Sequence, residues 1–396
     1  MDKIEELLTR GVANIIPGKE ELKKVLDTGK ILNIYLGIDP TMTRIHLGHA
    51  VPLRKLQQFS ELGHKVTFLI GDFTTLVGDT SDKESERPIL TPEEIKFNFQ
   101  TYKQQAEKII DFNKIEIVHN SEWLGKLTFS EIIKLTQNFS MNDFISRELI
   151  KKRLTEGKRV RLDEVLYPIM QGYDSYIMDT DLQLGGTDQT FNMQAGRILQ
   201  KNLRSKESFV MTNTFLSGTD GRKMSKTWSN AIWIDDTPEN IFAKIMAIND
   251  DLIIEYLTLC TNFSVSEIKN IANGLENGRN PMEVKKLLAF NVINDLHDAT
   301  LAENAKEHFE KTIQQKELPD EIPVYMYTGR NEIEITDLLI LVRFSSSKAE
   351  AKRLIEQGGV EIDGERITDP NKTVLVKNDM IIRVGKRRFA RIATGN

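Results

Sequence analysis

Two histidines lie three residues apart in the stretch IDPTMTRIHLGHA, which follows an apolar run typical of a buried strand. His46 and His49 stand in the turn that leads into a helix expected from about Val51. Two imidazoles with this spacing at a helix start share one face, and the free N–H groups of a helix N-terminus favour phosphate. Gly48, which lies between them, would let a flat ligand approach the backbone. The pattern predicts a phosphate-binding site, with two histidines that merely pack at a turn as the alternative.

A basic loop, DGRKMSKTWSN, is the second group that could do chemistry. Lys223 and Lys226 enclose Met224 and Ser225, and the sequence suggests no apolar face that this loop would bury. Such a loop could bring two ammonium groups onto a triphosphate and stabilise the charge of a departing pyrophosphate. Taken alone, a solvated basic loop is an equally good interpretation. Because the HLGH element precedes it in the same chain, the phosphate interpretation is favoured.

A third group lies in the segment LYPIMQGYD, which we expect to be helical. Tyr167, Gln171 and Asp174 are spaced four and three residues apart, so they share one helix face. These side chains are poor core material but suit the polar wall of a pocket. Tyr167 and Gln171, together with a carboxylate from elsewhere, could hold an ammonium group, and Asp174 could accept a phenol O–H. A surface face with scattered polar residues is the alternative.

The elements that must position these groups alternate between strand and helix in the first half of the chain. Strand-like runs such as ILNIYLGI and KVTFLIGDF are separated by helical segments, and residues 91–94 form the capping box of one of them. This alternation predicts an α/β fold with a doubly wound, Rossmann-like parallel sheet that binds ligands at its carboxyl edge. A helical domain and a small α+β domain follow. The expected boundaries are 1–230 for the α/β domain with a helical insertion at about 121–160, 231–318 for the helical domain, 319–333 for a linker and 334–396 for the α+β domain.

Composition restricts the class of protein. The chain has 396 residues, 40% of them hydrophobic, and a formal net charge of −5, which argues against a protein that coats nucleic acid. Its single cysteine, Cys260, excludes an internal disulfide and a multi-cysteine zinc site. No apolar stretch is long enough to cross a bilayer, so we expect a cytoplasmic protein without a membrane partner. The tail RVGKRRFAR has five basic residues, which suits either an RNA-binding appendage or a solvated face.

The two motifs HLGH and KMSK resemble the HIGH and KMSK signatures of class I aminoacyl-tRNA synthetases. The resemblance covers the whole chain, and several further segments are similar to bacterial tyrosyl-tRNA synthetases. It implies a ligase that activates L-tyrosine with ATP to tyrosyl-adenylate and pyrophosphate, and then transfers tyrosine to the 3′ end of tRNA(Tyr). It also implies magnesium on the ATP phosphates, no metal site of the protein itself, and a homodimer formed through the helical insertion.

The resemblance further assigns roles to individual residues. Asp79 matches the carboxylate for the substrate ammonium, and Tyr35 pairs with Asp174 around the phenol. The catalytic set comprises His46, His49, Lys223, Lys226, Lys83 and Arg87. The tyrosine-binding set comprises Tyr35, Asp79, Tyr167, Gln171, Asp174 and Gln189. The ATP-binding set comprises Asp39, Thr41, Gly48, Gly186, Asp188, Met224 and Ser225. For Arg87 a plain solvated loop is nearly as good an interpretation.

The last segment, from about residue 334, is similar to the S4 RNA-binding domain. Its two expected helices carry Arg343, Lys348, Lys352 and Arg353, and a stripe of this kind contacts phosphates without reading sequence. Separately, SRELIKKRLTEGKRVRLDE carries seven basic residues. These residues either meet the acceptor arm of a tRNA or form a solvated helix face.

Two rival functions from other classes stay open at this point. A small-molecule nucleotidyltransferase can share the His-x-Gly-His element, but such enzymes are shorter and need neither the S4-like tail nor the polar face on 167–174. A catalytically silent RNA-binding protein is disfavoured because both signature motifs are intact. Within the class, a tryptophanyl-tRNA synthetase is the nearest alternative, and the pairing of Asp174 with Tyr35 favours tyrosine.

Overall fold

The computed structural model describes residues 3–79, 90–225, 228–311, 322–329, 331–385 and 388–394. Lys83, Arg87 and Lys226, which the sequence placed in the catalytic set, lie outside the described residues. The chain forms two compact units, Met1–Ala302 and Glu303–Asn396. We describe each unit by itself. None of the helices within the described ranges is long and apolar enough to span a membrane.

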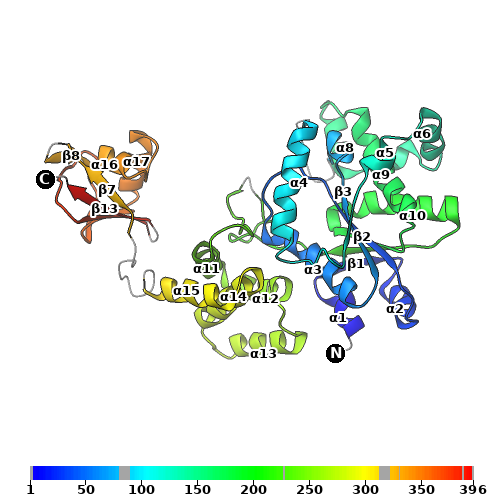
Figure 1. The fold of residues 1–396 in the computed structure, drawn as a ribbon, viewed down its shortest axis with the longest axis horizontal. Coiled ribbons are helices and arrows are strands. Elements are labelled where there is room, and N and C mark those ends of the chain that lie inside the picture. Colours follow the sequence, from blue (N-terminus) through cyan, green and yellow to red (C-terminus); the bar gives the residue numbers. More distant parts are fainter. Residues whose placement is uncertain are drawn as a thin grey trace. The chain divides into compact units, whose positions relative to one another are not determined.

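A six-stranded sheet forms the centre of the first unit, in the order β1-β6-β5-β2-β3-β4 (Figure 1). Strands β2 to β6 run parallel, and β1 is antiparallel to β6 at one edge. The strands are β1 (Val12–Ile16), β2 (Asn33–Ile38), β3 (Lys65–Ile70), β4 (Glu116–His119), β5 (Leu182–Gly186) and β6 (Phe209–Asn213). The predicted α/β fold with a parallel sheet is confirmed, and β2, which leads into the HLGH element, lies between β5 and β3.

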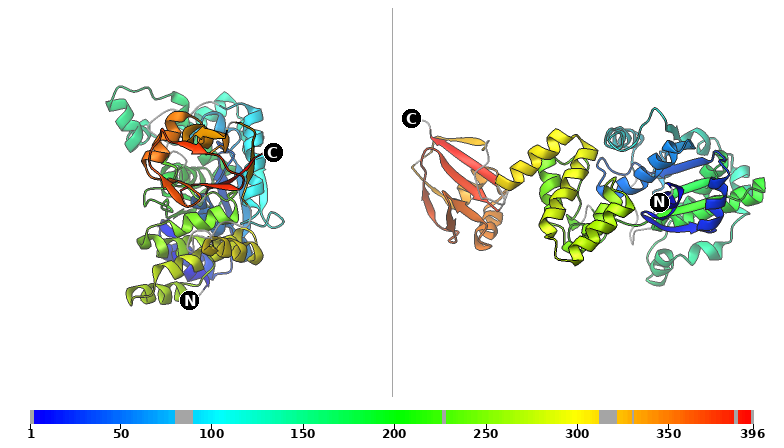
Figure 2. Two further views of the ribbon diagram at one scale, coloured as in Figure 1. Left: turned by 90° about the vertical axis from the view of Figure 1, so that its left-hand side faces the viewer. Right: turned by 90° about the horizontal axis from the view of Figure 1, so that it is seen from below.

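Helices cover both faces of this sheet (Figure 2). They are α1 (Lys3–Thr9), α2 (Lys19–Asp27), α3 (Leu47–Glu61), α4 (Pro92–Ala106), α9 (Leu162–Ile177) and α10 (Thr190–Arg204). Helix α3 buries Leu53, Leu56 and Phe59 completely, because residues three apart lie on one helix face. Helix α4 has the capping box expected from the sequence: Thr91 accepts from the backbone N–H of Glu94, and Glu94 accepts from that of Thr91.

Short helices make up the insertion between β4 and α9, as the sequence predicted. They are α5 (Ser121–Leu124), α6 (Phe129–Thr136), α7 (Met141–Ile145) and α8 (Glu148–Thr155). After β6 the chain is again helical, in α11 (Pro238–Met246), α12 (Ile253–Cys260), α13 (Val265–Glu276), α14 (Pro281–Leu296) and α15 (Ala299–Phe309). The Arg10 guanidinium donates to the carbonyls of Thr258 and Thr261 at the end of α12. This contact attaches the N-terminal segment to the helical region.

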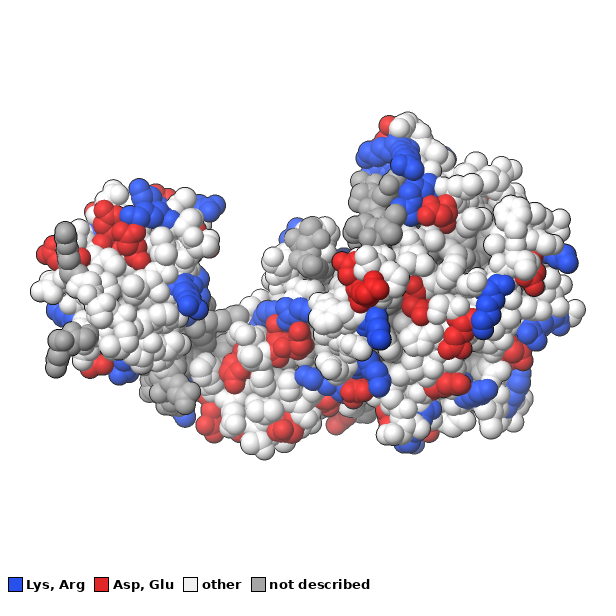
Figure 3. All heavy atoms as spheres, turned by 45° about the horizontal axis from the view of Figure 1, so that its top comes forward, with Lys and Arg blue, Asp and Glu red and all other residues white. Residues whose placement is uncertain are grey.

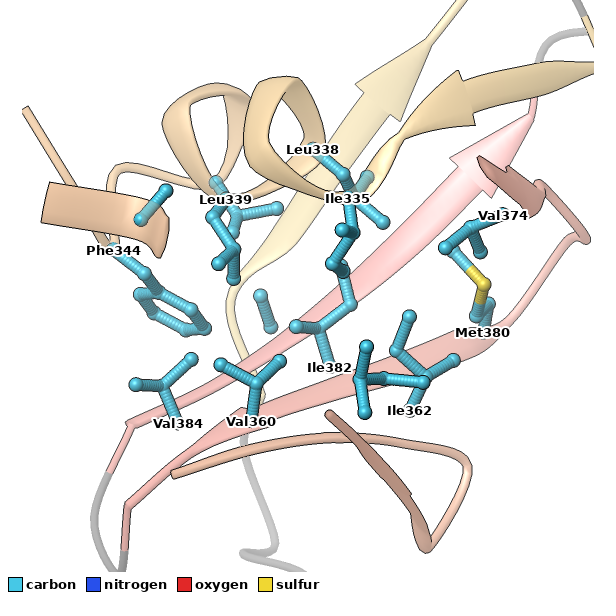
Figure 4. Close-up of a cluster of buried hydrophobic side chains, with 14 of the residues drawn as sticks. Ile335, Leu338, Leu339, Phe344, Val360, Ile362, Val374, Met380, Ile382 and Val384 are labelled. Atoms are coloured by element: carbon cyan, nitrogen blue, oxygen red, sulfur yellow. The ribbon is translucent and has the colours of Figure 1, made fainter. Parts of the chain in front are cut away.

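The second unit packs two helices on a five-stranded sheet of order β10-β9-β12-β13-β7, and a two-stranded sheet joins β11 and β8. Leu338, Leu339 and Ile382 are among the fully buried residues of its core (Figure 4). The elements are β7 (Val324–Tyr327), β8 (Glu332–Glu334), α16 (Ile335–Leu341), α17 (Lys348–Glu356), β9 (Val360–Ile362), β10 (Glu365–Ile367), β11 (Thr373–Leu375), β12 (Met380–Val384) and β13 (Arg388–Thr394).

Two features of this unit differ from the organisation expected from the sequence. Strand β7 and the first two residues of β8 lie within 319–333, where a linker was expected, and β7 pairs with β13. The basic tail contributes β13, because Ala390 and Ile392 alternate with Arg391 and fill the core. Residues 388–394 are therefore part of the sheet.

Candidate active site

The turn between β2 and α3 is fixed by side chains from α4. The Gln105 side chain accepts from the N–H of Ile45 across 3.0 Å and donates to the carbonyl of Thr43 across 2.8 Å. Asn98 donates to the carbonyl of Pro40 across 3.0 Å. These amides replace the regular hydrogen bonds that the turn lacks. The segment of chain that leads to the two histidines is therefore held in place by side chains of α4, which lie more than fifty residues further along the sequence.

The two histidines stack on each other at the start of α3, which begins at Leu47 and thus four residues earlier than expected. Their ring centroids lie 3.8 Å apart at an interplanar angle of 22°. The N–H of His46 donates to Nδ1 of His49 across 3.2 Å. Burial lowers the pKa of His46 to about 2, with smaller contributions from His49 and Lys223. His46 is therefore a neutral imidazole that can meet phosphate only through hydrogen bonds.

Nδ1 of His46 is buried and has no hydrogen-bond partner within the part of the chain that the structure describes. A buried polar atom without a partner is costly, so it points to a ligand or water at this position. Gly48 lies beside it: a Cβ atom added there would be 3.0 Å from two atoms of the His46 ring. A glycine at this position therefore leaves room for the ring, in addition to the backbone access expected from the sequence.

Backbone pairing connects the histidine element with the segment that follows the basic loop. The N–H of Leu47 donates to the carbonyl of Ile232 across 2.9 Å, and that of Ile234 donates to Ile45 across 3.0 Å. His46 and Trp233 form a β-bridge at the centre of this pairing. The HLGH motif is thus joined directly to a segment that begins six residues after the KMSK motif.

The basic loop is anchored by two side chains that point inward. Asn230 donates to the Asp220 carboxylate across 2.7 Å and to the carbonyl of Lys223 across 3.2 Å, and it accepts from the N–H of Ser225 across 2.9 Å. The Met224 side chain is 4% exposed. The expectation that the loop buries nothing apolar is therefore wrong: the methionine holds the loop against the protein, while the Lys223 side chain remains partly exposed.

Asp188 and Gly186 lie at the end of β5, close to the basic loop. The Asp188 carboxylate lies 3.8 Å from Nζ of Lys223. A Cβ atom added at Gly186 would be 2.6 Å from Oδ1 of Asp188, so a side chain there would displace the carboxylate. The structure brings these expected ATP contacts together with the first lysine of the loop.

Asp174 is fully buried on α9 and receives hydrogen bonds at both carboxylate oxygens. Trp123 donates its indole N–H to Oδ1 across 2.7 Å, and Asn120 donates to Oδ2 across 3.1 Å. Burial raises the pKa of Asp174 to about 8, although these two donors act in the opposite direction. The Asp39 and Asp72 carboxylates raise it further. This is a strongly perturbed carboxyl group of the kind found at functional sites.

Tyr35 is buried on β2, and its hydroxyl donates to Oε1 of Gln183 across 3.0 Å. These two residues are register partners in the adjacent strands β2 and β5. Burial raises the pKa of the Tyr35 phenol well above its usual value; the charge of Asp174 adds to the shift and a hydrogen bond with Gln171 opposes it. Tyr35 and Asp174 are thus brought close together, as the resemblance implied, and Gln171 lies beside Tyr35. The bond to Gln183 was not predicted.

A chain of hydrogen bonds runs from the polar face of α9 to the end of β2. The Tyr167 hydroxyl donates to Oδ2 of Asp39 across 2.9 Å. Thr74 donates to the other oxygen of Asp39 across 2.8 Å and accepts from Asn120 across 3.1 Å. Through Asn120 this chain reaches Asp174. Asp39, which the resemblance placed on the nucleotide side, is therefore tied directly to the expected amino-acid side.

Asp79 and Gln189 form the other side of the site. The Gln189 side chain donates to Oδ2 of Asp79 across 2.6 Å and accepts from Asn192 across 3.1 Å. Asp79 is almost fully buried.

The N–H of Thr41 makes a short backbone contact of 2.7 Å with the carbonyl of Asp39, in the turn that leads to the histidines. No group of three or more His, Cys, Asp or Glu able to hold a metal ion occurs among the residues that the structure describes.

Residues 28–314 match the family model of the class I tRNA synthetases (W and Y). The chain belongs to this family. This synthetase is 43% identical over 392 residues to the tyrosine–tRNA ligase of Thermotoga maritima, a match that covers 98% of this chain and 97% of that protein. It is 44% identical over 401 residues to the tyrosine–tRNA ligase of Carboxydothermus hydrogenoformans, with 98% and 97% covered.

Solved structures share the fold of this synthetase. A crystal structure of tyrosyl-tRNA synthetase complexed with L-tyrosine from Archaeoglobus fulgidus has a TM-score of 0.60 at 23% identity, covering 76% of this chain and 99% of that one. A C-terminally truncated mitochondrial tyrosyl-tRNA synthetase from Aspergillus nidulans has a TM-score of 0.66 at 22% identity, covering 77% and 92%.

The second unit of this synthetase contains an S4 domain, matched over residues 337–381. Of the four expected RNA contacts, Arg343, Lys352 and Arg353 are exposed. Lys348 is exposed as well, but its Nζ donates to Glu334 across 3.0 Å and to Asp337 across 2.9 Å. On the visible face of each unit, Lys and Arg side chains are interspersed with Asp and Glu (Figure 3).

The seven basic residues between α7 and α9 separate into two groups. Arg153 is buried and paired with Glu164 across 2.6 Å, and Arg161 pairs with Asp163 across 2.7 Å. The Arg147 guanidinium lies 4.9 Å from the centre of the Phe191 ring. Arg153 and Arg147 thereby attach the insertion to α9 and α10, and the Arg161 pair lies at the start of α9. The remaining basic residues are exposed and comprise Lys151, Lys152, Lys158 and Arg159.

Four residues of the site were missed at the level of sequence: Thr74, Asn120, Trp123 and Gln183. Asn120 directly follows β4, so its place at a strand carboxyl end was a usable signal. Gln183 is a polar residue inside a strand, which also indicates an internal partner. Thr74 and Trp123 gave no signal of this kind.

Proposed function

We propose that the chain is a tyrosine–tRNA ligase. In the first step, the tyrosine carboxylate attacks the α-phosphate of ATP, which forms tyrosyl-adenylate and releases pyrophosphate. In the second step, a ribose hydroxyl at the 3′ end of tRNA(Tyr) takes the tyrosyl group and releases AMP. The observation that carries the proposal is the buried Asp174 beside Tyr35, with its two carboxylate oxygens held by Trp123 and Asn120.

This arrangement selects for a phenol. The substrate hydroxyl donates to Asp174 and accepts from Tyr35, whose own hydroxyl then turns from Gln183 toward the substrate. Phenylalanine would fill the same space but leave the buried carboxylate and hydroxyl without a partner. The α-ammonium group of the substrate lies near Asp79, Tyr167 and Gln171. The hydrogen bond between Gln189 and Asp79 places an amide donor beside this group for the substrate carboxylate.

Adenylation needs no nucleophilic or basic side chain, because the tyrosine carboxylate is already ionised. Catalysis rests on positioning and on stabilising the charge that develops on the phosphates. His46 and His49 supply hydrogen bonds, and Lys223 supplies positive charge. By family resemblance Lys226, Lys83 and Arg87 supply further charge.

ATP enters as its magnesium complex, so magnesium is part of the substrate. Each of the residues assigned to ATP has a local role. Asp188 accepts from the ribose hydroxyls, and Gly48 and Gly186 leave space for the nucleotide. By family resemblance Asp39 and Thr41 complete the nucleotide side through the amino acid and the terminal phosphate, and Met224 and Ser225 keep the basic loop at the phosphates.

We propose that the S4 domain binds tRNA(Tyr) through Arg343, Lys352 and Arg353, with a lesser contribution from Lys348. We further propose a homodimer formed through the helical insertion. Large apolar side chains are exposed on the described part of the insertion and at the start of α9, among them Phe129, Ile133, Met141, Leu154 and Leu162. Phe129 is 78% exposed, which suits a surface that a second copy covers. The domain boundaries stated above, with β7 and β8 assigned to the C-terminal domain, and a cytoplasmic site of action complete the proposal.

Aminoacylation of unfractionated bacterial tRNA tests this function. With ATP and magnesium, the purified chain is expected to form acid-precipitable tRNA from labelled tyrosine. It should form none from labelled tryptophan or phenylalanine. Labelling with tryptophan in place of tyrosine would mean that the amino-acid substrate is wrong, although the family is correct.

A further inference from the structure

Phe215 is a partly exposed aromatic residue at the edge of the candidate active site. It lies two residues beyond the end of β6, and it is 43% exposed. Its ring packs against the end of β5, since a Cβ atom added at Gly186 would be 3.5 Å from Cε1 of Phe215. An exposed aromatic ring at the edge of a site can interact with a second group through its open face.

That face is covered by Lys223. Nζ of Lys223 lies 4.1 Å from the centre of the Phe215 ring, well within the range of a cation–π interaction. The Asp188 carboxylate is close as well, at 3.8 Å. Because an exposed ion pair of this length contributes little, we take the ring to be the main partner of the ammonium group.

The backbone around Phe215 also holds Lys223 in place. Ser217 and Lys223 form a β-bridge, and the N–H of Met224 donates to the carbonyl of Leu216 across 3.3 Å. The backbone of Lys223 and Met224 is therefore paired with Leu216 and Ser217, which directly follow Phe215. Lys223 also contributes to the low pKa of His46, which places its charge near the histidine pair.

We propose that Phe215 is a positioning residue for adenylation, and that its ring is the seat that holds the Lys223 ammonium group at the edge of the phosphate site. The inference rests on the proposed function. The aromatic face restricts the position of the ammonium group and adds no negative charge beyond that of Asp188, so positive charge stays available for the phosphates. The aliphatic chain of Lys223 has many rotamers, so a seat reduces the entropy lost when the ammonium group reaches the transition state.

Replacement of Phe215 tests this role through the split between kcat and KM. Phe215→Leu keeps an apolar side chain and removes the π face. We expect kcat for tyrosine-dependent ATP–pyrophosphate exchange to fall roughly 2- to 5-fold. The KM values for tyrosine and ATP should stay within about 2-fold, and Phe215→Tyr should restore most of kcat. Thermal unfolding of each variant checks that the fold is retained.

A double-mutant cycle distinguishes a role of Phe215 in holding the Lys223 ammonium group from a purely structural role. In a Lys223→Ala background, Phe215→Leu should cause no further loss, since the ring has no ammonium group left to hold. Trp228→Leu is a matched control, because Trp228 lies 4.7 Å from the Arg222 guanidinium on the same loop. It removes a similar contact that does not reach Asp188, and we expect kcat to stay within about 2-fold.

Two outcomes would overturn the inference while leaving the proposed function intact. One is an equal loss from Phe215→Leu with and without Lys223. The other is a raised KM for ATP at unchanged kcat, which would make the ring a platform for the adenine base. Absence of exchange in the unmodified chain would instead contradict the proposed function, and this inference with it.

Discussion

The indole N–H of Trp123 donates to Oδ1 of Asp174 across 2.7 Å, and this bond joins the first helix of the insertion to the polar face of α9. Burial disfavours the charged form of the carboxyl group, whereas Trp123 and Asn120 favour it. Their balance gives a pKa of about 8. The group is therefore poised between its two forms near neutral pH and can respond to the hydroxyl of a ligand.

Asp174→Asn is expected to weaken tyrosine binding about 10- to 100-fold and to leave ATP binding nearly unchanged. The amide keeps the shape of the carboxylate but loses the charge that accepts the phenol O–H. Separate titrations with tyrosine and ATP measure the two affinities. Asp163→Asn, the same change at the start of α9, should affect neither. Comparable losses for tyrosine and ATP would show that Asp174 does not read the phenol.

Tyrosine affinity is expected to rise with pH between about 6.5 and 8.5. Below the pKa of about 8 the Asp174 carboxyl is mostly protonated, and the ionised form that accepts the phenol proton gains population as the pH rises. Calorimetric titrations at several pH values provide the measurement, and Asp174→Asn should abolish the rise in tyrosine affinity with pH. A rise that persists in the variant would mean that another group titrates.

The same pKa predicts the effect of pH on stability. Because the native pKa of Asp174 is above the unfolded value of about 4, the native state binds more protons between about pH 4 and 8. The contribution of this group is complete below pH 4 and is lost as the pH rises through 8. Urea unfolding should therefore show a steeper fall in unfolding free energy over this range for the unmodified chain than for Asp174→Asn.

Lys223→Ala is expected to lower the rate of tyrosyl-adenylate formation about 100-fold without changing tyrosine affinity. The removed charge acts on the phosphates in the transition state. Single-turnover formation of the adenylate provides the rate. Arg222→Gln removes a charge from the neighbouring position and should have little effect, since Arg222 is paired with Asp220. If the two variants were equally impaired, net charge of the loop would matter more than the placement of Lys223.

Glu164→Gln is expected to destabilise the chain by about 3–5 kcal/mol, because it leaves the buried Arg153 guanidinium without its counter-charge. The two side chains are 3% and 1% exposed. Urea unfolding measures the change. Glu156→Gln breaks the exposed pair with Lys158 and should cost less than about 1 kcal/mol. Similar losses of unfolding free energy in both variants would mean that the buried pair of Arg153 and Glu164 contributes no more to stability than an exposed pair.

Arg353→Ala is expected to weaken tRNA binding and to lower the slope of log affinity against log salt by about 0.7–0.9, the loss of one phosphate contact. Binding measured at several salt concentrations gives the slope. The double variant Lys348→Ala/Glu334→Ala removes an ion pair at constant net charge and should lower the slope by less, since Nζ of Lys348 is held by Glu334 and Asp337. A larger change in the double variant would place the RNA at Lys348 instead.

Residue spacing predicted those parts of the site that lie within one element. His46 and His49 are three residues apart at a helix start, and their rings do stack. Tyr167, Gln171 and Asp174 occupy one face of α9, because spacings of four and three match the helical turn. The alternation of strands and helices likewise predicted the parallel sheet, since it reflects burial on both faces of the sheet.

Partners from distant elements could not be predicted from spacing. Tyr35 meets Gln183 only because β2 and β5 pair in one particular register, and a shift of one residue would separate them. Met224 is buried because the loop folds back against Leu216. Lys348 pairs with acids that precede its own helix. Each of these contacts depends on tertiary packing, on which local sequence carries little information.

The most direct test of the central claim is amino-acid-dependent ATP–pyrophosphate exchange on the purified chain without tRNA. Tyrosine, phenylalanine and tryptophan are compared at equal concentration, and circular dichroism confirms that the protein is folded. The account predicts exchange with tyrosine and none above background with the other two amino acids. Exchange driven by tryptophan, or no exchange with any of the three, would contradict it.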